Sequence, residues 1–324
     1  MRHVVGVDVG ATKTKVGFFT LDGSLIYADT FTTPRGVGGS SIAEAIVYKV
    51  REISSRIGGE IVAVGIGTIG PIDIRQGDVV RTPNIGQESF KLKVPIEKAL
   101  GVKTYVVNDC IAAAWGEYLV GAGRGSSNVV YLTISTGIGG GAVVDDHLLL
   151  GKDGNAHEVG HIVLDYSGKF KCGCGGVGHW EGIASGANIP RTASLLSTEW
   201  GGPKTEAYWR AMREQLSPEL LFAYWASGDA FADYLVNFLA EVDAAGVGSA
   251  INVYDPEVVT IGGSIALRNP EFFRLIERRI GRYTINRAPR VLLTPLGDDA
   301  VVIGAAMIAI NTPSNLVRLQ SGQA

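Results

Sequence analysis

Short apolar runs alternate with amphipathic segments along almost the whole chain. The runs are rich in β-branched residues and end in glycine or polar residues, as buried strands do. They predict strands at residues 4–10, 15–19, 24–33, 61–67, 102–107, 128–135, 141–145, 258–261 and 291–293. Apolar positions at helical spacing predict helices at residues 40–57, 95–100, 111–120, 231–250 and 270–282, and one from about residue 299 onward.

The order of these elements predicts an α/β fold with two lobes. A strand, a glycine turn and a second strand begin at residue 4 and again at residue 128, which indicates two lobes of similar build with a cleft between them. A chain of 324 residues is long enough for one large or two medium domains. We assign residues 1–108 to a small lobe and residues 109–298 to a large lobe, and we expect a C-terminal helix at about 299–324 to return to the small lobe.

Composition and charge narrow the class of protein. Hydrophobic residues make up 46% and charged residues 19% of the chain, which is ordinary for a globular enzyme. The net charge of -3 indicates no nucleic-acid or anionic-membrane partner. Asp8 interrupts the first apolar run, which argues against a signal peptide, and residues 300–310 are too short a run to span a bilayer. Three cysteines favour a reducing compartment over a disulfide framework. We expect a cytoplasmic protein.

The loop at residues 157–186 concentrates side chains that can bind a metal. It contains four imidazoles and thiols: His161, Cys172, Cys174 and His179. Such a set suits a tetrahedral Zn²⁺, which would fix a glycine-rich segment that has few side chains to bury. Glu158 and Glu181 flank the set and stay available for another ligand. The alternative is a turn with chance cysteines and surface histidines, but two of only three cysteines forming Cys-x-Cys disfavours it.

Two glycine turns join pairs of predicted strands. The first contains Gly10, Thr12, Lys13 and Thr14, whose amides, hydroxyls and ammonium can hold a phosphate. Asp8 before it is a hard oxygen ligand suited to Mg²⁺ through water. The second turn has the same character and contains Ser135, Thr136, Gly137 and Gly139.

A third glycine pair, Gly262 and Gly263, follows a strand and could let a base or ribose lie against the backbone. The first turn lacks the spacing of a P-loop, and the second lacks that of a dinucleotide-binding turn. A plain strand-to-helix turn explains the Gly262-Gly263 pair nearly as well. The set of three favours a nucleotide site.

Asp109 lies where a predicted strand ends and a predicted helix begins. Catalytic side chains in α/β sheets usually project from this position. Aspartate is also a favoured N-cap, so capping would explain the residue as well. Asn108 adds a second polar group at the strand end, which a cap does not require. Local sequence leaves both interpretations of Asp109 open.

Together these motifs resemble those of the ROK family of sugar kinases and repressors. The resemblance runs from residue 4 to about residue 310. The three glycine turns resemble the family's two phosphate motifs and its adenosine motif. Glu158-x-Gly160-His161 and Cys172-x-Cys174-Gly-x-x-Gly178-x-x-Glu181 are similar to the family signature. The resemblance implies a two-lobed actin-like ATPase (ribonuclease H-like) fold with a cleft between the lobes.

The resemblance also implies roles for individual residues. Asp109 becomes the general base that takes the proton from the 6-hydroxyl of a hexose, with ATP and Mg²⁺ as phosphoryl donor and cofactor. The remaining sugar contacts are Asn84, Asn108, Glu158, His161 and Glu181. Structural zinc falls to His161, Cys172 and Cys174, and His179 stands where the family pattern has a third cysteine. A homodimer is expected.

Several functions remain compatible with the family. An ATP-dependent hexokinase or glucokinase leads, followed by N-acetylmannosamine kinase and then fructokinase. A sugar-responsive repressor is expected to carry a DNA-binding domain ahead of the first phosphate motif, whereas here the first predicted strand begins at residue 4. A non-catalytic sugar sensor is expected to have lost the acid at position 109, which this chain retains.

Overall fold

The computed structural model describes residues 1–35, 41–80, 89–156 and 158–321. The chain divides into two compact units. The first comprises residues 1–131, 141–157 and 298–324, and the second comprises residues 132–140 and 158–297. The predicted lobe boundary at residues 108 and 109 stays a prediction, because compactness alone divides the chain elsewhere.

A five-stranded sheet with the order β3-β2-β1-β4-β8 organises the first unit. Its strands are β1 (Arg2–Val9), β2 (Lys13–Phe19), β3 (Leu25–Thr32), β4 (Glu60–Thr68) and β8 (Lys103–Asn108). The first three strands pair antiparallel, whereas β1, β4 and β8 run parallel. Val9 pairs with Thr68, and Thr68 pairs with Asn108. The carboxyl ends of the parallel strands therefore share one edge, where polar side chains from separate strands gather.

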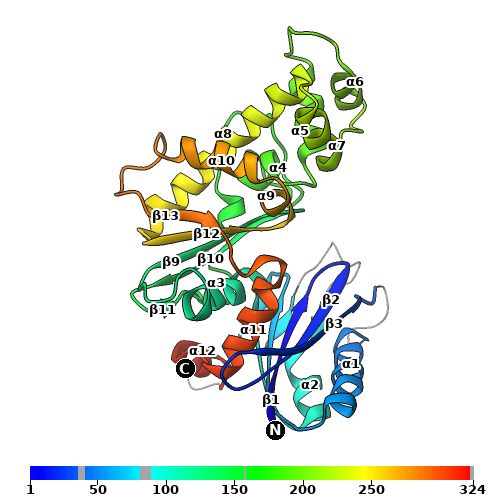
Figure 1. Ribbon diagram of the computed structural model, residues 1–324, viewed down its shortest axis with the longest axis vertical. Coiled ribbons are helices and arrows are strands. Elements are labelled where there is room, and N and C mark those ends of the chain that lie inside the picture. Colours follow the sequence, from blue (N-terminus) through cyan, green and yellow to red (C-terminus); the bar gives the residue numbers. More distant parts are fainter. Residues whose placement is uncertain (36–40, 81–88, 157, 322–324) are drawn as a thin grey trace. The chain divides into compact units, whose positions relative to one another are not determined.

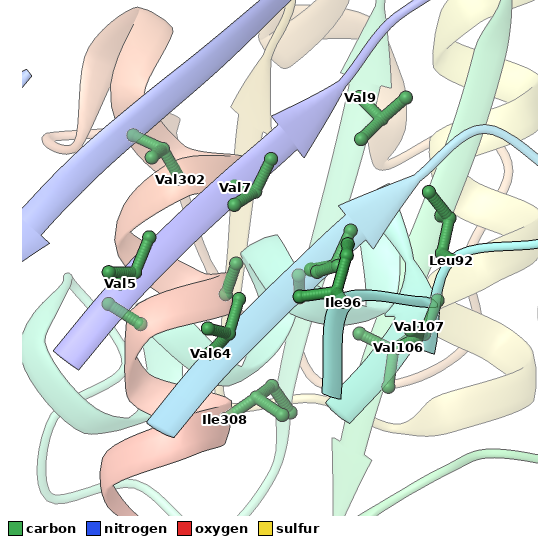
Figure 2. Packing of buried hydrophobic residues seen from close by; sticks show 14 of the residues in the cluster. Val5, Val7, Val9, Val64, Leu92, Ile96, Val106, Val107, Val302 and Ile308 are labelled. Atoms are coloured by element: carbon green, nitrogen blue, oxygen red, sulfur yellow. The ribbon is translucent and has the colours of Figure 1, made fainter. Parts of the chain in front are cut away.

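Helices α11 (Ala300–Ile310) and α3 (Asp109–Val120) pack against this sheet and against each other. Figure 2 shows Val302 and Ile308 of α11 among the valines of β1 and β4. Glycines allow the close approach: a Cβ at Gly65 would lie 1.8 Å from the carbonyl oxygen of Ala305, and one at Gly304 would lie 1.9 Å from that of Ala112. The last helices thus return to the first sheet (Figure 1).

The second five-stranded sheet has the order β11-β10-β9-β12-β13. Its strands are β9 (Val129–Ile134), β10 (Ile138–Val144), β11 (His147–Leu148), β12 (Val258–Gly262) and β13 (Arg290–Leu293). The prediction that a turn fills residues 137–141 is wrong, because β10 already begins at Ile138. A Cβ at Gly141 would lie 2.2 Å from the carbonyl oxygen of Cys110. The glycine there permits a close strand–helix approach and does not mark a turn.

Helices make up most of the second unit. They are α4 (Trp180–Ala184), α5 (Ile189–Ser197), α6 (Glu206–Met212), α7 (Pro218–Ala226), α8 (Ala230–Tyr254), α9 (Ser264–Arg268) and α10 (Pro270–Ile280), with a 3₁₀ turn at Val159–His161. The 25-residue helix α8 is the longest of these. It begins after Asp229, whose carboxylate accepts hydrogen bonds from the amides of Phe231 and Ala232. This capping interaction stabilises the start of α8, which contacts α4, α6, α7 and α10.

The remaining elements include two that the apolar pattern did not predict. A small antiparallel sheet of β5 (Ile72–Asp73), β6 (Asp78–Val79) and β7 (Phe90–Lys91) occupies part of the expected loop region. The single expected terminal helix is two helices, α11 and α12 (Ser314–Gln320), since Pro313 cannot continue a helix. Helix α1 (Ser41–Ile57), α2 (Lys93–Leu100) and a 3₁₀ turn at Gly297–Asp299 complete the described elements. In the described residues no single helix is long and apolar enough to cross a membrane, and α11 with α12 meets that requirement only as a pair bent by 79°.

Candidate functional site

The first glycine turn joins β1 to β2, and hydrogen bonds within the turn and to Thr33 stabilise its conformation. The amide of Gly10 donates to the carbonyl oxygen of Lys13 at 3.1 Å. Thr14 is buried, and its hydroxyl lies 2.9 Å from that of Thr33, which donates in turn to the carbonyl oxygen of Gly10. Thr12 and Lys13 are exposed. The turn therefore presents Thr12, Lys13 and backbone amides to a ligand, while Thr14 holds its shape.

Arg35 adds a cation beside this turn. Its Nη2 donates to the hydroxyl of Thr12 and to the carbonyl oxygen of Ala11, both at 3.2 Å. The sequence analysis missed Arg35, because its position depends on the pairing of β2 with β3, which places Thr32 opposite Lys13. A guanidinium at this place strengthens the turn's ability to hold phosphate.

Three carboxylates converge next to the turn. Burial, followed by the neighbouring Asp109 carboxylate, raises the pKa of Asp8 to about 7; Lys15 opposes this effect and Asp299 adds to it. Lys15 is the cross-strand neighbour of Asp8 and forms an ion pair with Asp299. Sequence reasoning found Asp8 and Asp109 but not Lys15 or Asp299, since α11 packing brings Asp299 here. A divalent cation would relieve the crowding of negative charge, so the cluster fits Mg²⁺.

Asn108 is the residue at the N-cap position of α3, so Asp109 is not needed as the cap. The side-chain oxygen of Asn108 accepts from the amide of Cys110 at 2.9 Å. Asp109 is the first helical residue, although its Oδ1 also accepts from that amide at 2.8 Å. Capping therefore does not require an acid at position 109. Asp109 lies in the first turn of α3, where the helix dipole favours negative charge.

A second amide side chain, Asn155, supports the loop beside Asn108. Its Oδ1 accepts from the amide of Ile72 at 2.9 Å, and its Nδ2 donates to the carbonyl oxygen of Ile72 at 2.8 Å. A Cβ at Gly70 would lie 3.3 Å from Nδ2 of Asn108 and 3.8 Å from Oδ1 of Asn155. No local pattern marks Asn155 in the sequence. The predicted sugar contact Asn84 lies outside the described residues.

The second unit brings Glu181 to the second glycine turn. The amide of Ile138 donates to Oε2 of Glu181 at 2.9 Å, and a Cβ at Gly137 would lie 2.7 Å from the same oxygen. Glu158 is half-exposed, with Oε2 at 3.5 Å from Nδ1 of His161, an ion-pair distance that lacks hydrogen-bond geometry. Glu181, one of the two predicted sugar-binding acids, thus lies against a turn that was predicted to hold phosphate.

The second and third glycine turns lie side by side, although more than a hundred residues separate them. The hydroxyls of Ser135 and Ser264 are 3.1 Å apart. Gly263 has φ +86°, and a Cβ there would lie 2.5 Å from the carbonyl oxygen of Ile134. Glycine is therefore required at position 263 both for its backbone angle and for the close approach. Of the other predicted residues, Thr136 lies in the second turn, whereas Gly139 lies in β10 and Gly262 is the last residue of β12.

These turns form one side of a cavity of about 520 Å³. Its lining comprises Ser135, Thr136, Gly186, Ala187, Pro218, Glu219, Phe222, Ala223, Ser264, Ile265, Arg268 and Asn269. Apolar side chains from α7 and α9 face polar groups from the turns, a combination typical of sites that take a flat apolar base with a polar sugar. Sequence analysis identified the turns but missed Phe222 and Arg268, because nothing in the helical pattern distinguishes a pocket wall from a core face.

The four predicted metal ligands converge in the second unit. One donor atom from each of His161, Cys172, Cys174 and His179 lies within 4.8 Å of all the others. Sγ of Cys174 is 3.3 Å from Nδ1 of His179, and neighbouring donors in a tetrahedral zinc site are about 3.3–3.8 Å apart. Two thiols and two imidazoles at these distances fit Zn²⁺.

Two of these ligands would have to lose a proton when a metal binds. Burial raises the pKa of Cys172 to about 11, so a bound cation is what would stabilise its thiolate. The Glu158 carboxylate raises the pKa of His161 to about 9, so metal binding would displace a proton from that imidazole. Gly176 makes room for the fourth ligand, since a Cβ there would lie 2.3 Å from the His179 ring.

The two α/β units, with glycine turns that end strands of both sheets, define the class: this is a protein of the actin-like ATPase fold, and the predicted fold class is confirmed. The sequence profile of the ROK family matches residues 4–312, so the chain belongs to the ROK family.

Individual relatives agree. The chain is 40% identical over 321 residues to a glucokinase of Aeropyrum pernix, covering 98% of this chain and 99% of that one. A ROK hexokinase from Thermus thermophilus is 34% identical with a TM-score of 0.81, covering 95% of this chain and 97% of that one. A ROK family glucokinase from Streptomyces griseus, in complex with glucose and AMPPNP, is 31% identical with a TM-score of 0.78, covering 95% and 99%.

Proposed function

We propose that this protein transfers the γ-phosphoryl group of ATP to the 6-hydroxyl of a hexose, with glucose as the preferred acceptor. The observation that carries the proposal is the position of the second glycine turn. Ser135 and Thr136 line the cavity, while the next two residues contact the carboxylate of Glu181. A nucleotide in the cavity and a sugar on Glu181 would therefore meet at one turn. Similarity to glucokinases over nearly the full length supports glucose.

The chain's own residues supply the steps of the reaction. The base and ribose bind in the cavity, against Phe222 and the third glycine turn. Amides of the glycine turns, with Lys13 and Arg35, hold the phosphates and withdraw charge as the phosphoryl group moves. Asp109 accepts the proton of the attacking hydroxyl late in the transfer. Glu158, Glu181, His161, Asn108 and Asn84 bind the other hydroxyls and orient the acceptor.

Two metal ions fit the residues present. Mg²⁺ would be held near Asp8, among the carboxylates of Asp109 and Asp299, and would neutralise charge on the β- and γ-phosphates. Zn²⁺ would be held by the four thiol and imidazole ligands and would be structural, because four protein donors leave no open position. Glu158 precedes the zinc ligands in the chain and Glu181 follows them. The conformation of the loop would therefore set the positions of both carboxylates for sugar binding.

A coupled kinase assay across sugars tests the proposal. We expect purified protein with ATP and Mg²⁺ to give the highest kcat/KM with glucose among glucose, mannose, fructose, glucosamine and N-acetylmannosamine. A preference for N-acetylmannosamine or fructose would replace glucose as the substrate while leaving the kinase assignment in place. Sugar binding in calorimetry without turnover of any of these sugars would identify a non-catalytic sensor.

We further propose that the protein acts in the cytoplasm as a homodimer. Family membership supports both statements. Light scattering of the purified protein at micromolar concentration decides the second, since a mass of about one chain, 34.2 kDa, would contradict a dimer.

A further inference from the structure

Glu181 lies on a helix that is too short to hold itself in place. Helix α4 has five residues, and an isolated helix of this length is unstable in water. Its first two residues are Trp180 and Glu181, and His179 of the metal cluster directly precedes them. The direction of the Glu181 carboxylate therefore depends on what holds Trp180.

Trp180 is anchored to the long helix α8. It is the largest fully buried side chain of the described residues. Its indole Nε1 donates to Oδ1 of Asp243 at 2.7 Å. A Cβ at Gly246 would lie 2.3 Å from the indole ring, so the ring packs directly on the α8 backbone at this glycine. Asp243 and Gly246 are three residues apart and share one face of the helix. Figure 1 shows α4 beside α8.

Asp243 is an unusual residue for a helix core. Its side chain is 0% exposed, and its Oδ2 has no hydrogen-bond partner among the residues that the structure describes. A buried polar group with an unpaired atom is costly, whereas a hydrocarbon of similar size would not be. Core packing alone therefore does not account for an acid at this position. The directed hydrogen bond to the indole does.

Other residues of α4 contact the second glycine turn and the metal loop. Oε2 of Glu181 accepts from the amide of Ile138, at the start of β10. Gly182 lies against Cys172, where a Cβ would be 2.9 Å from its Cα. A rotation of α4 about its axis would therefore have two effects. It would move Glu181 away from the second glycine turn, and it would disturb the metal loop at Cys172.

We propose that Asp243 and Trp180 are positioning residues for hexose binding: their hydrogen bond fixes α4 on α8 and so aims the carboxylate of Glu181. The proposal rests on the proposed function in that it takes Glu181 to bind the sugar. It adds two residues that belong neither to the cavity lining nor to the four candidate metal ligands.

Three variants and a matched control test it. Asp243→Leu removes the acceptor at similar volume, Trp180→Phe removes the donor, and Asp243→Asn keeps an oxygen for the indole. The control is Asp233→Leu, because Asp233 on the same helix accepts from the indole of Trp225 at 3.1 Å in an exposed position away from α4.

We expect Asp243→Leu and Trp180→Phe each to raise the hexose KM roughly 10-fold, the effect of one lost buried hydrogen bond. The ATP KM should stay within about 2-fold, and the double variant should be no worse than either single one. Asp243→Asn and Asp233→Leu should keep the hexose KM of the unaltered protein. A lower melting temperature of Asp243→Leu with an unchanged hexose KM would overturn the proposal and reduce the pair to a packing role.

A substrate-independent measurement separates this inference from the proposed function. The amide of Ile138 reports the position of Glu181, because it donates to that carboxylate. Its hydrogen–deuterium exchange should be faster in Asp243→Leu than in Asp243→Asn or Asp233→Leu. If no hexose is phosphorylated, the proposed function fails. Faster exchange of the Ile138 amide in Asp243→Leu than in Asp243→Asn and Asp233→Leu would still support the positioning role. Equal exchange in all variants would overturn it.

Discussion

Single residues decide what the site can do, and their roles follow from neighbours that the sequence does not place beside them. From local sequence Asp109 was open to two interpretations, and the structure assigns the cap to Asn108. Thr14 is a residue type that can contact phosphate, yet its hydroxyl is hydrogen-bonded to the hydroxyl of Thr33. Residue types at the right spacing thus indicate the chemistry, whereas the partner of each polar group depends on strand pairing and helix packing.

Asp243 makes stability depend on pH. Burial raises its pKa to about 8 from an ordinary value of 3.8. Between these values the folded protein keeps a proton that the unfolded chain releases, so the free energy of unfolding falls as pH rises, by up to about 1.4 kcal/mol per pH unit. Asparagine does not titrate. Urea unfolding at pH 5.5 and 7.5 should therefore favour Asp243→Asn over the unaltered protein more strongly at pH 7.5; a constant difference would show that Asp243 is ionised when folded.

Elements were predicted well where one signal acts alone. The parallel strands and helix α3 appear where apolar runs and a strand-end polar pair indicated them. The prediction failed where glycine has two uses: Gly139 to Gly141 read as a turn but lie in β10, because glycine also permits close packing. The short sheet of β5, β6 and β7 has strands of two residues, too few to show an alternation.

Packing of α11 on α3 depends on Gly304. Gly304→Ala should lower the free energy of unfolding by about 1–3 kcal/mol, because the new Cβ meets a carbonyl oxygen of the backbone and both helices must shift. Gly281→Ala is the control, since its added Cβ meets no atom of the described residues within 4 Å and should change stability by less than about 0.5 kcal/mol. Denaturant unfolding measures both. Equal effects would show that α3 and α11 separate at little cost.

The metal loop should depend on His179. His179→Ala leaves three donors, so zinc affinity should fall by at least about 10–100-fold, the loss that even an outer-shell partner of a zinc ligand causes. The sugar KM should rise and the melting temperature should fall, because the loop flanks Glu158 and Glu181. His179→Cys should keep the metal, since thiolate and imidazole are both ordinary zinc ligands. Elemental analysis and chelator titration measure this; an active, fully folded protein that contains no zinc would refute the assignment.

At the scale of the whole molecule, family and fold could be predicted from sequence because the motifs lie along nearly the full chain. The cavity lining could not. Helices α7 and α9 and two glycine turns contribute to it, and their meeting is a consequence of the fold. The C-terminal helices show the same limit: apolar composition predicts that α11 is buried, but only the glycines of its contacts explain how closely it packs.

The central claim is that Asp109 acts as the base in ATP-dependent phosphorylation of glucose. The most direct measurement compares the unaltered protein with Asp109→Asn, following the product by ³¹P NMR and glucose binding by calorimetry. The account predicts glucose 6-phosphate from the unaltered protein, nearly equal glucose affinity in both proteins, and turnover roughly 10²–10⁴-fold lower in the variant. Near-normal turnover by Asp109→Asn, or no phosphate ester at the 6-position from the unaltered protein, would contradict it.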